Sequence, residues 1–297
     1  MTYSIVARDP ATGELGVAVQ SHWFSVGSTV PWAEPAVGVV ATQSIADPSY
    51  GPNALDLLRG GVAAPDALAQ LLRRDTQSAV RQVLIVDSHG RAAVHTGRRC
   101  IQFAGDQTGR GFACAANMMR GEGVPEAMAH AYTTAVGDLS DRLLAALDAA
   151  EAAGGDVRGR QSAAMIVVRS RDEQWDRSLD LRVEDSAFPL VELRRLVRLR
   201  QAYDLGERAD DLTGEGRTQE AALLYRRASE LAPENHELRF WAGLALVQLG
   251  ERAAGLDHVR TAISENAGLG ELLSRLSPEI APSAPAVREA LGRFDGR

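Results

Sequence analysis

Strand-like runs open the chain. Residues 2–8 and 14–20 both read as strands, and the turn-forming segment DPATG separates them. We therefore expect a β-hairpin at the start of the chain. Further strands are predicted at 23–30 and at 37–43, where the run VGVVATQ is apolar almost throughout, as in a strand covered on both faces.

The spacing then changes to that of helices. Leucines and alanines recur three and four residues apart after Tyr50 and again after Pro65, which predicts two amphipathic helices. Four strand-like runs follow, at 82–87, 92–96, 100–104 and 111–117. Helical spacing returns over 124–136 and 139–153, and two more strands are predicted at 161–169 and 178–184. The order is four strands, two helices, four strands, two helices and two strands.

This order predicts the fold class. Strands as apolar as these need cover on both faces, and helix pairs between blocks of strands supply a layer outside each sheet. We predict an α+β fold for residues 1–200, in which two stacked sheets lie between two helical layers as a four-layer αββα sandwich.

From about residue 202 the chain shows a repeat. Gly216 recurs as Gly250 and Ala228 as Ala262, both at a period of 34 residues. A period of this length with helical spacing predicts a tetratricopeptide-like domain over residues 201–297.

The two copies match the tetratricopeptide pattern unequally. The first has Ala221, Tyr225, Ala228 and Pro233 at the expected spacing, whereas the second has Gly255 where alanine is usual. Two helical pairs are fewer than usually stand alone, so we expect them to pack on the first domain, on a capping helix near 269–276 or on a second copy. A protein partner is one role for these repeats, and bracing a homodimer is the other.

Composition narrows the classes of function. A net charge of −7 argues against a general affinity for nucleic acid or an anionic membrane, because both depend on a basic surface. No run reaches the roughly 18 consecutive apolar residues of a membrane helix, and we expect a cytoplasmic protein. Cys100 and Cys114 lack close spacing, which predicts two reduced thiols.

The chain contains no lysine, since all 32 basic residues are arginine. Chemistry that needs a lysine amine is therefore excluded, including pyridoxal phosphate attachment and the phosphate-binding lysine of a P-loop. Arginine cannot replace lysine as a base because it stays protonated in proteins. The six histidines show no metal-binding spacing and no dinucleotide fingerprint follows a strand, so neither a metal nor a cofactor is predicted.

Thr2 is the candidate nucleophile. Loss of Met1 would place its hydroxyl beside a free α-amine, whose reference pKa of about 7.7–8.0 allows it to act as a base near neutrality. The alternative is that Thr2 is only one of the small residues common behind an initiator methionine. Ser4 is a rival on the same strand face about 6.6 Å further along, but it lacks an adjacent amine.

The sequence resembles a known family through long blocks: SIVARDPATGELGVAVQS, VPWAEPAVGVVATQ, PSYGPNALDLLRGG, HTGRRC and GGDVRGRQSAAMIVV. These resemble an uncharacterised Ntn-hydrolase-like family, domain of unknown function 1028, over roughly residues 1–200. The resemblance implies the αββα fold of the N-terminal nucleophile hydrolases, with the nucleophile at the start of the first strand. It implies no particular substrate.

The resemblance also implies further site residues. In proteasome-like relatives, the loop before the ninth strand supplies an aspartate and a serine that hold the N-terminal amine, which corresponds here to Asp156 and Ser162. The alternative is a glycine-rich turn with a solvated aspartate. Gln161 lies in the same loop and is a candidate for substrate binding.

Other strand ends supply the remaining candidates. Gln43 is a candidate donor to the developing oxyanion, and Ser44, which follows it into the next loop, is a candidate for substrate binding. Asn117 closes the eighth strand, where related sites also place a polar group. Ser21 and His22 end the second strand and are the nearest groups that could replace the lysine of proteasome-like enzymes. Each of these residues could instead satisfy local backbone groups.

We therefore expect an N-terminal-threonine amidohydrolase that acts on a small amide or peptide-like compound through an acyl-enzyme. The alternative is a non-catalytic scaffold of the same fold that binds a metabolite or presents its helical repeats to a protein partner.

Overall fold

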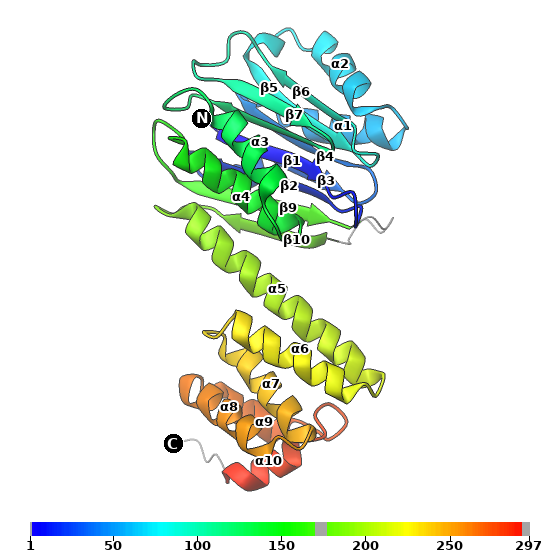
Figure 1. Ribbon diagram of the computed structural model, residues 1–297, viewed down its shortest axis with the longest axis vertical. Helices are drawn as coiled ribbons and strands as arrows, with labels where there is room; N and C mark the ends of the chain where they lie inside the picture. The colour runs from blue at the N-terminus through cyan, green and yellow to red at the C-terminus, as the bar shows by residue number, and fades with distance from the viewer. Residues whose placement is uncertain (1, 170–176, 293–297) are drawn as a thin grey trace. The chain divides into compact units, whose positions relative to one another are not determined.

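A computed structural model describes residues 2–169 and 177–292. The chain divides into two compact units, Met1–Val197 and Arg198–Arg297. The first unit contains the strands and four helices packed on them, and the second is helical (Figure 1). The sheets are antiparallel throughout, so the predicted α+β class is confirmed.

The larger sheet has six strands in the order β10-β9-β2-β1-β8-β7. β1 lies in its interior, between β2 and β8. The bounds of the strands are β1 Thr2–Arg8, β2 Leu15–Ser21, β7 Gly105–Gly109, β8 Phe112–Asn117, β9 Ser162–Val168 and β10 Arg177–Val183.

The smaller sheet has four strands in the order β3-β4-β5-β6. Their bounds are β3 Pro31–Glu34, β4 Gly38–Ser44, β5 Arg81–Asp87 and β6 Ala92–Thr96. The predicted order of strands and helices is confirmed.

Three apolar clusters separate four layers. Val6, Val17 and Leu84 belong to the cluster between the two sheets. On the outer face of the larger sheet, Tyr3 and Ile5 pack with helices α3 (Val124–Thr134) and α4 (Leu139–Ala152). On the outer face of the smaller sheet, β4 and β5 pack with helices α1 (Tyr50–Arg59) and α2 (Ala64–Arg74).

Two predicted strands were wrong. Residues 23–30 form a loop with a 3-10 turn, Val26–Ser28, after Ser25 at a left-handed φ of 55°. The third strand is Pro31–Glu34 instead. Residues 100–104 are also irregular, with Phe103 at a φ of 58°, and the strand follows at Gly105–Gly109. The polar sequence of this segment gives no strand signal. It becomes a strand through its backbone pairing with β8.

The second unit is built from helices. Helix α5 (Pro189–Gly214) crosses the boundary between the units. The others are α6 Thr218–Leu231, α7 His236–Gln248, α8 Arg252–Glu265, α9 Gly268–Arg275 and α10 Ala284–Leu291. Gly255 explains the departure from the repeat pattern, because a Cβ there would lie 2.5 Å from the carbonyl oxygen of Gly243. Only glycine allows α7 and α8 to approach this closely.

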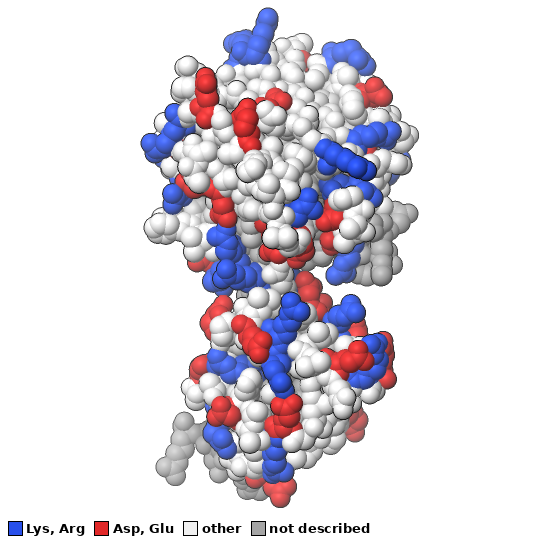
Figure 2. All heavy atoms as spheres, viewed as in Figure 1, with Lys and Arg blue, Asp and Glu red and all other residues white. Residues whose placement is uncertain are grey.

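Charged side chains are mixed on the surface. On the face shown in Figure 2, arginines and carboxylates are interspersed over each unit. Among the described helices, none combines the length and apolar character needed to cross a bilayer.

Asp87 joins two parts of the smaller sheet's outer layer. Its side chain is buried, and its Oδ2 accepts a hydrogen bond from the backbone N–H of Ala64 at 3.1 Å, where α2 begins. Its Oδ1 accepts the backbone N–H groups of His89 and Arg91, each at 3.0 Å, which close the turn into β6. Burial opposes ionisation, but these bonds and the Arg91 guanidinium hold the pKa of Asp87 below its usual value.

We predict that Asp87→Ala lowers the free energy of unfolding by about 2–4 kcal/mol at pH 7, because one buried and two partly buried N–H groups lose their acceptor. A lowered pKa means that the carboxylate stabilises the fold above its unfolded pKa of about 3.9 and loses this effect as the pH falls through the folded value. Urea denaturation at pH 7 and pH 3 measures both effects.

Asp56→Ala is the matched control, because the Asp56 carboxylate pairs with Arg59 on the exposed surface. It is expected to change the free energy of unfolding by less than about 1 kcal/mol. Equal effects of the two substitutions at pH 7 would contradict the anchoring role of Asp87.

Candidate active site

The layer between the two sheets is apolar along most of its length and polar at one end. Inward-facing positions alternate along each strand, so Val6 is followed on the same face of β1 by Ser4 and Thr2. The strands β2, β8, β4 and β5 also have a polar inward-facing residue at this end: Ser21, Asn117, Gln43 and Gln82.

Three of these polar residues and Ser162, the first residue of β9, form a row across the larger sheet. The strand registers pair Ser162 with Ser21, Ser21 with Thr2, and Thr2 with Asn117. Neighbouring strands lie about 4.8 Å apart, so Ser21 and Asn117 are the direct neighbours of Thr2 and Ser162 lies one strand further away. We call Ser162, Ser21, Thr2 and Asn117 the polar row.

Thr2 is held at three points. Its Oγ1 lies 3.0 Å from the Oγ of Ser21. Its carbonyl oxygen accepts the side-chain amide N–H groups of Asn117 at 3.3 Å and Gln43 at 3.4 Å. The residue is 6% exposed. The nucleophile predicted from the sequence is therefore tightly positioned by residues from β2, β8 and β4.

Gln82 organises the amides around Thr2. Its Oε1 accepts from Gln43 Nε2 at 2.7 Å and from Asn117 Nδ2 at 2.9 Å. Its Nε2 donates to Thr96 Oγ1 at 2.9 Å and to the backbone oxygen of Ala116 at 3.0 Å. A buried amide must be satisfied in this way, because an unpaired one costs about 1–3 kcal/mol.

The sequence reasoning missed Gln82, although a signal was present. Gln82 opens the apolar run QVLIVD at an inward-facing position, where a glutamine needs partners. It also missed Thr96, whose hydroxyl accepts from Gln82 and donates to Asp106 and so links the two residues.

Two predicted residues have their hydrogen-bonding groups in use. Gln43 Nε2 donates to Thr2, Gln82 and Ala115 within 3.4 Å, so its observed contacts position Thr2 rather than leave a donor for an oxyanion. Ser4, the rival nucleophile, donates its hydroxyl to Gln43 Oε1 at 2.7 Å.

Asn117 retains one unused group. Both contacts of its side chain are made through Nδ2, while its Oδ1 is buried without a hydrogen-bond partner among the described residues. Because Asn117 is paired with Thr2 across β1 and β8, this oxygen is an unfilled acceptor on the residue next to the candidate nucleophile.

Asp156 and Ser162 hold the loop that follows β2. The buried Asp156 carboxylate accepts the backbone N–H of His22 at 3.1 Å and lies 3.3 Å from the guanidinium of Arg158. Ser162 accepts the backbone N–H of Val26 at 3.0 Å and donates to the carbonyl of Trp23. Ser162 thus lies on the far side of Ser21 from Thr2, whereas Asp156 also pairs in an isolated β-bridge with Met119, which follows β8.

The other predicted binding residues surround this region. His22 directly follows Ser21, and its Nδ1 is buried without a hydrogen-bond partner among the described residues. Ser44 ends β4 at a left-handed φ of 72°. The carbonyl oxygen of Gln161 accepts the backbone N–H of Ser186 at 2.7 Å, so its backbone closes the loop before β9.

The adjacent Tyr3 faces the opposite side of β1. Its hydroxyl donates to Glu151 Oε2 at 2.7 Å, and Glu151 also pairs with Arg160. Burial, followed by the nearby Glu151 charge, raises the pKa of Tyr3, so the phenol stays protonated. Tyr3 therefore anchors the start of β1 to α4 and takes no part in the polar row.

Apolar side chains are exposed in the loops at this same end. Trp23 and Phe24 are 62% and 64% exposed directly after β2, in the loop that Asp156 and Ser162 hold. Other exposed apolar residues lie in the loops after β4, before β7 and before β9: Ile45, Ile101, Phe103 and Val157. We call these six residues the apolar rim.

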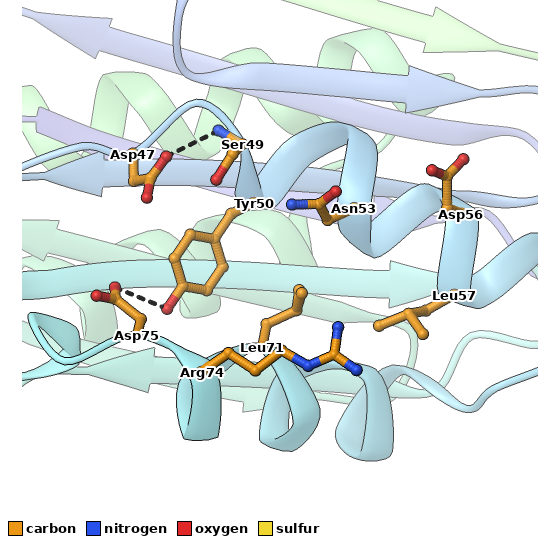
Figure 3. A pocket seen from close by; sticks show the side chains of 9 residues that line it. All are labelled: Asp47, Ser49, Tyr50, Asn53, Asp56, Leu57, Leu71, Arg74 and Asp75. Atoms are coloured by element: carbon orange, nitrogen blue, oxygen red, sulfur yellow. Dashed lines mark hydrogen bonds between the residues drawn. The ribbon is translucent and has the colours of Figure 1, made fainter.

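Three cavities of this unit lie outside the polar row. A cavity of about 440 Å³ lies between α1 and α2, where the Tyr50 hydroxyl donates to Asp75 at 3.0 Å (Figure 3). Two others, of about 500 and 320 Å³, adjoin Glu151 and Arg160. Thr2 lines none of the three.

Neither cysteine is placed as a nucleophile. Both are free thiols, and burial raises the pKa of Cys114 to about 12, so it remains protonated at neutral pH. Among residues 2–169 and 177–292, no three histidine, cysteine or carboxylate side chains are grouped to hold a metal ion.

Comparison with known proteins places this site within a family. No curated protein matches the chain. The model of the family of unknown function DUF1028 matches residues 2–193 and thus begins at Thr2. The crystal structure of protein SPO2555 from Silicibacter pomeroyi, assigned to the DUF1028 family model, is 32% identical. It is similar with a TM-score of 0.61 over 66% of this chain and 84% of that one. Since the family model covers more than half of its length, this chain belongs to the DUF1028 family.

Proposed function

We propose that this protein is an N-terminal-threonine amidohydrolase that acts on a small amide or peptide-like compound. The observation that carries the proposal is the position of Thr2, at the first residue of β1 and 3.0 Å from the Ser21 hydroxyl. The N-terminal nucleophile hydrolases, which the sequence resembles, have a helical layer on each of two stacked sheets. Their nucleophile is the first residue of the first strand.

The base in this proposal is the α-amine that removal of Met1 would release on Thr2. An amine needs hydrogen-bond acceptors in its protonated form. Asn117 is paired with Thr2 across the strands, and its Oδ1 is an acceptor that has no hydrogen-bond partner among the described residues. We assign Asn117 to hold this amine, with Gln43 and Gln82 keeping Asn117 and Thr2 in position.

The proposed reaction has two stages. In the first, the Thr2 hydroxyl proton passes to the amine as Oγ1 bonds to the carbonyl carbon of the substrate. The amine then protonates the leaving nitrogen, the C–N bond breaks, and an ester remains on Thr2. In the second stage a water attacks the ester and gives a proton to the amine, which returns it to Oγ1 as the acid leaves.

Ser21 takes the place that lysine has in proteasome-like enzymes. The chain has no lysine, but the Ser21 hydroxyl is within hydrogen-bond distance of Thr2 Oγ1. A donor at this position stabilises the developing negative charge on Oγ1 during attack. Asp156 and Ser162 act indirectly in this proposal, by holding the loop next to Ser21.

The apolar rim favours a substrate with an apolar group. Trp23 and Phe24 follow Ser21 directly along the chain and are more than half exposed. Apolar side chains beside a site contribute binding through burial of the ligand's apolar surface. We therefore propose an apolar acyl or side-chain group next to the cleaved amide.

A second candidate function is a non-catalytic scaffold that binds a metabolite or a protein. The observation in its favour is that Thr2 is 6% exposed and lines none of the three cavities described above. A threonine in this setting would satisfy the hydrogen bonds of the polar row and do no chemistry.

We also propose that the second unit is tetratricopeptide-like. Helices α6 and α8 begin at Thr218 and Arg252, one 34-residue period apart, and each has 14 residues. A homodimer, a protein partner on these helices and a cytoplasmic location remain predictions from the sequence.

We predict that the mature protein lacks Met1 and that Thr2→Ala lowers hydrolysis of a responsive amide by at least about 10³-fold, because the nucleophile is removed. Intact mass tests the first statement. A panel of amides with apolar acyl groups, followed by an electrophilic probe and peptide mapping, tests the second, with the adduct expected on Thr2.

Thr76→Ala is the matched control, since Thr76 is exposed in the segment after α2 and its loss should leave the rate unchanged. Retained Met1 or an unchanged rate in Thr2→Ala would remove Thr2 from the mechanism and favour the scaffold, whereas an adduct on Ser4 would make Ser4 the nucleophile.

We predict that Asn117→Asp moves the acidic limb of the pH–rate profile upward by about one to two pH units. A carboxylate beside the Thr2 amine favours its protonated form and raises its pKa, so a higher pH is needed to free the base. Asn53→Asp, at an exposed position of α1, is the control and should leave the limb in place. A limb that does not move in Asn117→Asp would exclude contact between Asn117 and the base.

A further inference from the structure

The second unit contains a cavity of its own, of about 660 Å³. Its lining comes from α5, α6, α7 and residues 279–283, which precede α10. All of these residues lie within Arg198–Arg297. The volume falls in the range of small-ligand pockets, about 300–1,000 Å³.

Aromatic rings contribute to this cavity from three helices. Tyr203 belongs to α5, Tyr225 to α6 and Trp241 to α7, and each is partly buried. Trp241 is braced from behind by Phe240, with ring centroids 5.4 Å apart in an edge-on arrangement. Large fixed rings of this kind provide π faces that attract cations.

The charged residues that line the cavity are all acidic. They are Glu207, Asp210, Glu237 and Glu279, and no arginine is among the lining residues. Two of them are held by the aromatic residues, because Tyr203 donates to Glu237 Oε2 at 2.9 Å and Tyr225 donates to Asp210. These bonds fix the directions of the carboxylates and leave their charge uncompensated.

Several carboxylates elsewhere in this unit are compensated by arginine. On its outer surface Glu220, Glu251 and Glu265 each pair with an arginine. In the cavity only Glu207 does so, with Arg200 at 3.1 Å. Within the described part of the chain, no ion pair to arginine is seen for Asp210, Glu237 or Glu279.

We propose that this cavity binds an organic cation, a guanidinium or ammonium group carried on an apolar stem. Carboxylates without an arginine partner, two of them held by tyrosine hydroxyls, and three aromatic rings are the two kinds of group that stabilise such a cation. Leu244, Ala281 and the 69% exposed Ile280 supply an apolar wall for the stem. A bare metal ion fits less well, since no three potential ligands among the described residues are grouped to hold one.

Two sources carry this chemistry, a free amine and an arginine side chain of a peptide. Isothermal titration of the full-length protein with agmatine and with the blocked peptide Gly-Arg-Gly distinguishes them. At least tenfold tighter binding of agmatine indicates a free amine, and at least tenfold tighter binding of the peptide indicates an arginine side chain. Similar binding of both shows that the guanidinium group alone is recognised. The same peptide with citrulline in place of arginine keeps the shape without the charge and is expected not to bind.

The variants test the lining directly. We expect the double variant Asp210→Asn/Glu237→Gln to weaken binding at least tenfold, and Trp241→Leu to weaken it about fivefold. Asp210 and Glu237 are exposed, so helical content measured by circular dichroism should not change. Glu271→Gln, an exposed acid of α9 outside the cavity, is the matched control and should bind as the wild type does.

Binding of the citrulline peptide as tightly as the arginine peptide, undiminished binding in the double variant, or no binding of either cation would overturn the proposal. The inference does not depend on the proposed hydrolase, and Thr2→Ala should bind the cation unchanged.

Discussion

The alternation of side chains along the strands between the two sheets is the constraint on which the rest of the structure depends. Each inward-facing position must match the layer it enters, because burial of apolar surface drives the sheets together. Val6, Val17 and Leu84 satisfy this in the middle of the layer. At one end the same positions become polar, and these polar groups must then pair with one another.

The amide network is the consequence of that change. Gln43, Gln82 and Asn117 come from both sheets and join the end of the layer through hydrogen bonds instead of apolar contact. A network of this kind fixes positions more narrowly than apolar packing does, because each bond has a preferred direction. Thr2 is held within it by its own carbonyl oxygen, which leaves the hydroxyl facing Ser21.

The two units use their charged residues differently. Around the polar row, Asp156 is compensated by Arg158 and by a backbone N–H, so it serves as a structural anchor. In the helical unit, Asp210, Glu237 and Glu279 line the cavity together with aromatic rings and have no arginine partner within the described part of the chain. The first arrangement stabilises a loop, whereas the second leaves a field that a cation could neutralise.

Much of the fold was readable from the sequence, because apolar periodicity directly records which face of an element is buried. Apolar periodicity predicted the order of the elements and most of their bounds correctly. It failed at 23–30 and 100–104, where apolar residues are exposed in loops, and at Gly105–Gly109, where polar residues form an edge strand. Periodicity cannot distinguish an apolar loop from an apolar strand before the neighbouring strands are known.

The candidate site shows the same division. Thr2 and Asn117 were found from the sequence because each ends or begins a strand with a polar residue. Gln82, which joins Asn117 to Gln43, was not, since it lies 80 residues from Thr2 and its role comes from a contact between sheets. The sequence by itself determined the residue types and the faces they occupy. Only the tertiary structure decided which of them meet, because strand pairing and sheet stacking set distances that chain spacing does not contain.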